Sequence, residues 1–168
     1  VPPVAAAALG RAGFDVLTLA NNHIVDFGAA GITDTLAALD AAGLSGVGAG
    51  SNLAEARRSA ILEVKDQKVA FLAYSNTFPE AFWAGEDRAG TAPGWPGLVS
   101  RDVRRARQAA DYVVVSFHWS SELMTRPKDY QRDLARLAID NGAQVVLGHH
   151  PHVLQGVEHY NGGVIYYS

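Results

Sequence analysis

The sequence contains no cysteine, one methionine and no long apolar run. Without thiols, disulfides and thiolate metal sites are excluded, so any metal would be held by histidine, asparagine, carboxylate or backbone oxygen. No apolar stretch approaches the roughly 20 residues of a membrane-spanning helix. The first residues also lack the basic start and long apolar core of a signal peptide. We expect no membrane span here, and any information on export or anchoring lies outside these residues.

Charge is also scarce and nearly balanced. Charged residues make up 18% of the chain, the formal net charge is −3 and the pI is about 6.0. Nothing in this balance favours binding to nucleic acid, which requires a basic surface. Hydrophobic residues make up 48%, and 168 residues are enough to bury one continuous core. The composition therefore predicts a single globular domain over residues 1–168.

Helical patterns alternate with short apolar runs along the chain. Apolar spacing and terminal glycines predict helices over 4–13, 29–42, 99–110 and 130–141. Buried strands are expected at 14–20, 112–117 and 144–147, and hairpins at 60–64 with 68–74 and 153–160 with 164–168. This order predicts an α/β layered sandwich, and the hairpins make its β-sheet mixed.

Two other stretches allow more than one interpretation. Residues 78–97 contain three of the seven prolines and two of the three tryptophans. They are interpreted as a long loop, either functional or mobile, or a surface excursion with aromatic anchors. The helix at 99–110 carries four arginines on one side, which we interpret as a solvated face rather than a phosphate site: Arg101, Arg104, Arg105 and Arg107.

Polar clusters follow three of the predicted strands. Asn21-Asn22-His23 follows the first, His118 ends the second, and the run from His149 to His152 follows the third. Ligands of open α/β sheets bind at the carboxyl ends of strands, and five of the six histidines fall there. In extended chain, His150 and His152 would lie on one side, about 6 to 7 Å apart. The clusters predict a metal site, although a lone strand-end histidine is more often a simple hydrogen-bonding residue.

Three blocks of sequence resemble those of CapA-type proteins, which take part in capsule and poly-γ-glutamate synthesis. They are LANNHIVDFG at 19–28, His118-Trp119 with Glu122, and VVLGHHPHVLQ at 145–155, and YNGGVIYYS at 160–168 resembles the start of a further block. CapA proteins in turn resemble calcineurin-like metallophosphoesterases. The resemblance spans nearly the whole chain and implies a metallophosphoesterase-like sandwich with two divalent metal ions, either Mn, Fe or Zn.

The resemblance also implies a set of metal ligands. Asn22, His118, His150 and His152 would hold the two ions. His149 is a less certain ligand, because only His150 and His152 stand two positions apart.

Catalytic roles follow from the same resemblance. His23 would be the general acid for the leaving oxygen, and Asp26 would orient its imidazole. Glu122 would either support a ligand or face the substrate.

The chain departs from the family pattern in three respects. Ser120 stands where the family often has glycine, and Gln144 where it often has aspartate, but neither is an expected ligand. The Gly-Asp block that supplies a bridging carboxylate is absent before Asn21, because Asp15 lies in the strand itself. We therefore expect a partial CapA-like domain that is truncated at both termini and has an incomplete acidic half of its site.

Three functions are consistent with these observations. The first is a CapA-like role in making an extracellular anionic polymer, together with other capsule-synthesis proteins at the cell envelope. The second is a soluble metal-dependent phosphoesterase acting on a small phosphate ester. The third is a non-catalytic scaffold that handles the polymer, although retention of His23 favours catalysis.

Overall fold

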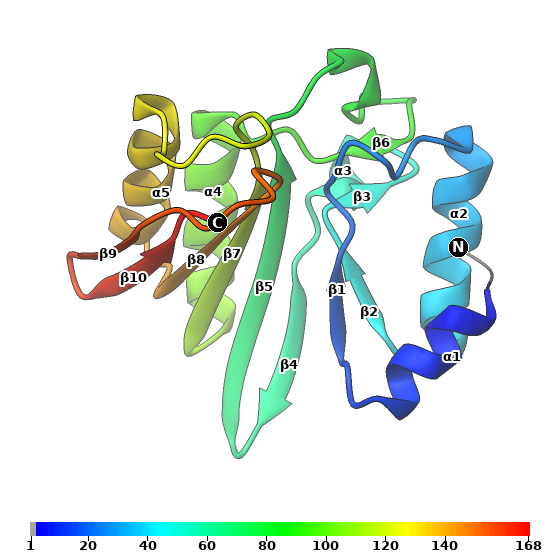
Figure 1. Ribbon diagram of the computed structural model, residues 1–168. Helices are drawn as coiled ribbons and strands as arrows, with labels where there is room; N and C mark the ends of the chain where they lie inside the picture. Colours follow the sequence, from blue (N-terminus) through cyan, green and yellow to red (C-terminus); the bar gives the residue numbers. More distant parts are fainter. Residues whose placement is uncertain (1–2) are drawn as a thin grey trace.

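The computed structural model describes residues 3–168 (Figure 1). Within them a six-stranded sheet and a two-stranded sheet lie face to face between helices, together with a third sheet of two short strands. The larger sheet has six strands among these residues, in the order β4-β5-β7-β8-β10-β9. Their bounds are β4 (Ala60–Val64), β5 (Gln67–Ser75), β7 (Tyr112–His118), β8 (Val145–His149), β10 (Gly163–Tyr166) and β9 (Val157–Tyr160). Strands β5, β7, β8 and β10 are parallel, and β4 and β9 pair antiparallel at the edges. The mixed sheet predicted from the sequence is therefore confirmed.

Two long helices cover one face of the large sheet. Helices α4 (Pro96–Ala109) and α5 (Asp129–Asp140) pack their apolar stripes on the central strands. Val99 and Val103 of α4 and Val113 and Val115 of β7 are all fully buried there. Burial of such side chains contributes about 1.5 to 3 kcal/mol each, which fixes the strands that carry the polar clusters.

Helix α4 has one buried charged residue, for which the sequence analysis made no prediction. Its four arginines are exposed, as predicted, but Asp102 on the opposite side is almost completely buried. Its carboxylate accepts a hydrogen bond from Arg57 at 2.6 Å and one from the hydroxyl of Tyr74 at 3.2 Å. A buried charge is tolerated when it is paired in this way, and this pair ties the short helix α3 (Leu53–Ala56) to the core.

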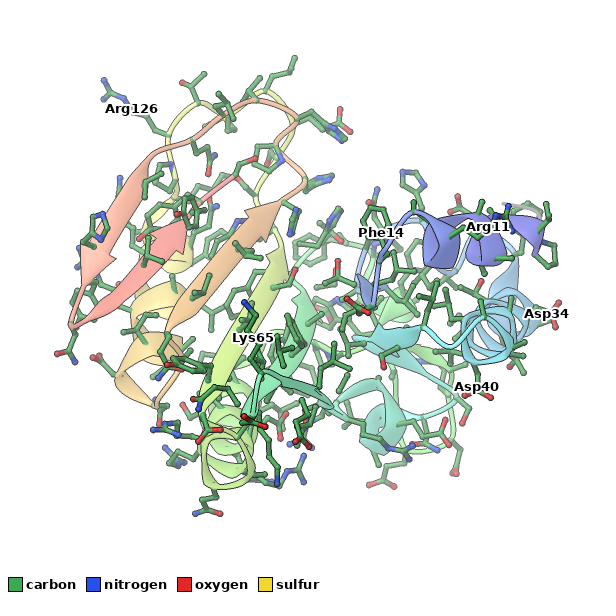
Figure 2. The ribbon with its side chains drawn as sticks, turned by 90° about the horizontal axis from the view of Figure 1, so that it is seen from below. Arg11, Phe14, Asp34, Asp40, Lys65 and Arg126 are labelled. Atoms are coloured by element: carbon green, nitrogen blue, oxygen red, sulfur yellow. The ribbon has the colours of Figure 1, made fainter. Side chains whose placement is uncertain are left out.

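A smaller sheet forms the second half of the structure. Strand β1 (Val16–Thr18) pairs in parallel with β2 (Ser45–Val47), and helices α1 (Val4–Arg11) and α2 (Gly28–Ala41) pack on this pair. The prediction of a strand at 14–20 buried on both faces was wrong in extent and environment, because β1 is short, partly exposed and belongs to this separate sheet. Figure 2 shows Asp34 on the outer side of α2, away from the strands.

The two sheets are in close contact at Gly48. A side chain at this position would lie 2.7 Å from the Cβ atoms of Ala20 and Ala73, so only glycine fits. Ala92 donates a backbone hydrogen bond to Gly48 (2.9 Å) and accepts one from Ser75 (2.8 Å), so it links the two sheets. The interface between the sheets places the end of β1 beside the ends of β5 and β7.

The stretch 78–97 is more ordered than the predicted loop. It contains a 3-10 helix, η1 (Glu80–Phe82), and strand β6 (Gly90–Thr91), which pairs with β3 (Ala49–Gly50). Residues 90–94 are buried, because they form the link between the sheets. The prediction of a surface excursion holds for residues 78–81, 86–88 and 95–97, which are exposed and include the aromatic residues Phe78 and Trp95.

Candidate metal centre

The carboxyl ends of β1, β5 and β7 lie at the upper edge in Figure 1, and polar residues that follow strands of the two sheets meet there. Ser75, His118 and His149 are partners in the parallel register of β5, β7 and β8, so these three strands end together. Asn22 arrives from the turn after β1. Its Oδ1 atom lies 2.9 Å from Nε2 of His118. The structure thus brings together two predicted ligands that lie 96 residues apart in the sequence.

His150 and His152 complete the cluster from the loop after β8. The ring centroid of His150 lies 4.7 Å from that of His118 and 5.8 Å from that of His152. The two side chains are close, as expected, but the reason inferred from extended backbone was wrong. Strand β8 ends at His149, and His150 and His152 both have left-handed backbones, with φ of +98° and +58°. Such conformations cost free energy in residues other than glycine and are concentrated at functional sites.

Glu122 lies against the same loop. Ligand atoms of Glu122, His150 and His152 all lie within 4.8 Å of one another, which is a group that could hold a metal ion. The backbone N–H of Leu123 donates to the carbonyl oxygen of Pro151 at 2.8 Å, so the two loops are joined directly beside these side chains. The sequence had left the role of Glu122 open.

His23 and Asp26 form a separate pair at the rim. Nδ1 of His23 lies 3.0 Å from Oδ2 of Asp26, and both side chains are exposed. Nε2 of His23 lies 3.4 Å from Nδ2 of Asn22, so the Asn22 amide stands between His23 and His118. With Nδ1 protonated toward the carboxylate, Nε2 is the nitrogen that faces the cluster.

The remaining residues of the two histidine blocks have distinct positions. His149 shares a face of the sheet with His118, because the two are register partners on neighbouring parallel strands. Trp119 is fully buried, stacks on Phe117 and donates its Nε1–H to the carbonyl oxygen of Tyr167 at 3.0 Å. A Cβ atom on Gly148 would lie 2.1 Å from that same oxygen. Trp119 and Gly148 therefore have packing roles that fix the strand ends.

Burial favours the neutral form of three of the clustered imidazoles. The pKa of His118 is lowered from 6.5 to about 3, first by burial and then by the neighbouring histidines His150, His149, His152 and His23 in that order. Burial also lowers the pKa of His149 and of His150, and for His150 the nearby Glu122 carboxylate partly opposes this effect. A neutral imidazole presents the lone pair that a metal ion requires, so the cluster is suited to bind a cation at neutral pH.

Two observations show that a divalent ion fits these residues. Nδ1 of His150 is buried and has no hydrogen-bond partner among residues 3–168, which is costly for a polar atom unless a ligand satisfies it. The donor set of imidazole nitrogens, an amide oxygen and a carboxylate matches the preferences of Mn, Fe and Zn ions.

The polar residues after β5 were missed in the sequence. Asn76 follows this strand directly, and its backbone N–H donates to the carbonyl oxygen of His118 at 2.8 Å. The hydroxyl groups of Ser75 and Thr77 lie 2.8 Å apart beside it. A signal was available, because Ser75-Asn76-Thr77 follows an apolar strand just as the three recognised clusters do.

Comparison with known proteins identifies the family. The family model described as "Bacterial capsule synthesis protein PGA_cap" matches residues 1–168. The chain belongs to this family. It is 38% identical over 165 residues to the capsule biosynthesis protein CapA of Bacillus anthracis, covering 96% of this chain and 40% of that protein. It is 40% identical over 156 residues to the PGA biosynthesis protein CapA of Bacillus subtilis, covering 92% and 41%.

The family assignment confirms the predicted resemblance to CapA proteins, although the chain spans about two fifths of the length of these two relatives.

Solved structures show the same fold. The NAD nucleotidase of Haemophilus influenzae superposes with a TM-score of 0.62 at 15% identity, covering 92% of this chain and 30% of that one. The 5′-nucleotidase precursor of Thermus thermophilus gives 0.59 at 19% identity, covering 90% and 29%. These likenesses confirm the layered α/β fold, which the chain shares with these two nucleotidases.

Proposed function

We propose that this PGA_cap-family chain carries a divalent metal centre of the phosphoesterase type that acts in the synthesis of a capsule or poly-γ-glutamate polymer. The convergence of Asn22 and His118 from two different sheets carries the proposal, since nothing in the packing of either sheet alone requires this contact. His150 and His152 supply the remaining nitrogen ligands. The expectation of two ions is part of the proposal, and their identity is left among Mn, Fe and Zn.

Asn22 and His118 already have a geometry and a charge state that suit metal binding in the absence of an ion. Asn22 presents its amide oxygen toward His118, and the depressed pKa of His118 keeps the imidazole lone pair free. When bound, a divalent cation would polarise a phosphoryl oxygen and stabilise the charge that develops on it.

His23 is placed to move a proton at the edge of this cluster. Asp26 accepts from Nδ1 and thereby fixes the ring orientation, with Nε2 turned toward Asn22. A proton carried on Nε2 can pass to a departing oxygen at the centre, which is the work of a general acid. A purely structural metal site has no need of such a pair.

The polymer role rests on the family. The relatives are named for capsule and PGA biosynthesis, so the substrate would be an anionic polymer or a phosphate ester used in making it. Other capsule-synthesis proteins at the cell envelope would be its partners. Within residues 3–168, no helix has the length and apolar character to cross a membrane.

Hydrolysis of glycerol 2-phosphate, whose alkoxide leaving group needs a proton, in the presence of Mn²⁺ tests the catalytic part. We expect His23→Ala to lower kcat by about 10²- to 10⁴-fold, the usual contribution of a general acid. His159→Ala is the matched control, because His159 lies on the exposed hairpin strand β9, outside the cluster, and should leave kcat within about twofold. If the metal-loaded wild type shows no hydrolysis above free Mn²⁺, the non-catalytic scaffold is the better account.

A further inference from the structure

We propose that Glu122 is an acidic ligand of the ion held by His150 and His152. The inference rests on the proposed metal centre and assigns to it a carboxylate that the sequence had left without a definite role. Glu122 lies in the loop between β7 and α5, and its carboxylate and the two imidazoles have ligand atoms within 4.8 Å of one another. Neighbouring ligands of a tetrahedral ion, each at about 2.1 Å, are about 3.4 Å apart. Rotations of the three side chains would bring their ligand atoms from the observed separations to this spacing around an ion.

The loop that carries Glu122 is fastened to the histidine loop. Beside the Leu123–Pro151 backbone hydrogen bond, Nε2 of Gln155 donates to the carbonyl oxygen of Met124 at 2.7 Å. Nε2 of Gln131 donates to Oε1 of Gln155 at 3.3 Å, and Oε1 of Gln131 accepts from the backbone N–H of Lys128 at 2.9 Å.

Burying two glutamine side chains costs free energy, and packing alone does not explain why they are there. Gln131 is completely buried and Gln155 nearly so, and a buried amide is tolerated only when its hydrogen bonds are made. Through these hydrogen bonds the two amides tie the loop to Gln155 at Met124 and at Lys128, both of which follow Glu122. An exposed glutamate on a free loop would sample many positions, whereas Glu122 is kept beside His150 and His152.

The charge of the ligand set is the second reason to assign Glu122 as a ligand. Asn22, His118, His150 and His152 are neutral donors, so they offer no negative charge to a divalent cation. Within residues 3–168, Glu122 is the carboxylate in the metal-binding group, and Asp26 is engaged by His23. Two histidines and one glutamate form a ligand set that divalent zinc and related ions accept.

A third reason is a buried nitrogen of His150. Nδ1 of His150 is shielded from solvent and has no partner among the residues that the structure describes. An ion between His150 and Glu122 would satisfy this atom and neutralise the carboxylate together.

Calorimetric titration of the purified apoprotein with Mn²⁺ tests the assignment. We expect Glu122→Gln, which keeps the shape and removes the charge, to weaken Mn²⁺ binding by about tenfold or more. Glu63→Gln is the control, because Glu63 is exposed on β4 opposite Lys68, near the start of β5 and away from its carboxyl end. It should change the affinity by less than about twofold. Unfolding of both apoproteins should match that of the wild type, which excludes a folding defect.

The outcomes separate this inference from the metal centre itself. If the wild type binds Mn²⁺ and His150→Ala abolishes binding, while Glu122→Gln binds as the wild type does, Glu122 is not a ligand and the centre stands. If the wild type binds no Mn²⁺, both proposals are wrong. The visible absorption of bound Co²⁺ gives a second readout: loss of the Glu122 carboxylate should shift the band, and an unchanged spectrum would overturn the assignment even where the affinity falls.

Discussion

The Oδ1 atom of Asn22 lies 2.9 Å from Nε2 of His118, although the two residues come from opposite sheets. Two donors at right angles on one ion, each at about 2.1 Å, would be about 3.0 Å apart. The contact therefore has the spacing of neighbouring metal ligands before any ion is bound. It depends on the close approach of the sheets at Gly48, where no side chain fits.

Ser120 is predicted to make the folded protein less stable than a glycine at the same position would. Its backbone is left-handed, with φ of +72°, and its Oγ atom is buried without a partner in the part of the chain that the structure describes. A left-handed backbone costs about 1 to 2 kcal/mol in residues other than glycine. We expect Ser120→Gly to raise the free energy of unfolding by about 1 kcal/mol in urea denaturation.

A glycine substitution of opposite sign provides the control. Ser100→Gly, inside α4 (Pro96–Ala109), should lower the free energy of unfolding by about 0.5 to 1 kcal/mol, because glycine weakens a helix interior. Equal destabilisation by both changes would contradict the role given to the Ser120 backbone.

Gln131 should be a main stabilising residue of the loop that carries Glu122. Gln131→Leu keeps the volume but leaves the buried Oε1 of Gln155 without a donor and the N–H of Lys128 without its acceptor. We expect a loss of about 1 to 3 kcal/mol in the free energy of unfolding. Gln108→Leu, the same change at an exposed position of α4, should stay within about 0.5 kcal/mol. A neutral Gln131→Leu would show that the glutamine pair does not hold the loop.

The stability of the metal-free protein should fall in mild acid. The pKa of His118 is lowered from 6.5 to about 3, mainly by burial. Between these values the unfolded chain binds a proton at His118 that the folded protein does not, so the free energy of unfolding decreases as pH falls through that window. His149 and His150, whose pKa values are also lowered by burial, act in the same direction.

Removing the ring isolates the contribution of His118. In His118→Gln, urea denaturation between pH 4.5 and 7 should give a shallower slope than in the wild type. The difference should be below the one-proton value of about 1.4 kcal/mol per pH unit, because the ring is partly exposed. Parallel slopes in the two proteins would contradict the lowered pKa.

The sequence was sufficient to predict, in chain order, the helices and strands that form the large sheet and its helical layer. It also predicted the sheet edge at which the histidines lie. Apolar strands such as 112–117 end in polar residues, and parallel strands share one carboxyl edge, so this part follows from local pattern. The small sheet was not predictable in the same way. Strand β2 (Ser45–Val47) lies in a glycine-rich stretch without an apolar run, and its pairing with β1 depends on tertiary contacts. The prediction that residues 1–168 form a single domain stays a prediction.

The site shows the same division. The block at 19–28 indicated Asn22 and His23 by resemblance, and the structure places them beside His118. The left-handed backbones of His150 and His152 could not be predicted from the sequence. Glycine is the residue type that commonly adopts this conformation, and neither position is a glycine. The position of Glu122 depends on two glutamines that lie 24 residues apart in the chain, a contact that no local pattern encodes.

Divalent-ion content is the most direct test of the central claim that Asn22, His118, His150 and His152 form one metal centre. The protein would be loaded with Mn²⁺, freed of unbound ion and analysed by mass spectrometry of the metal. The account predicts that the wild type and His159→Ala retain the ion, whereas His118→Ala and His150→Ala lose most of it. A wild type without bound ion, or a His118→Ala variant that keeps the wild-type content, would contradict it.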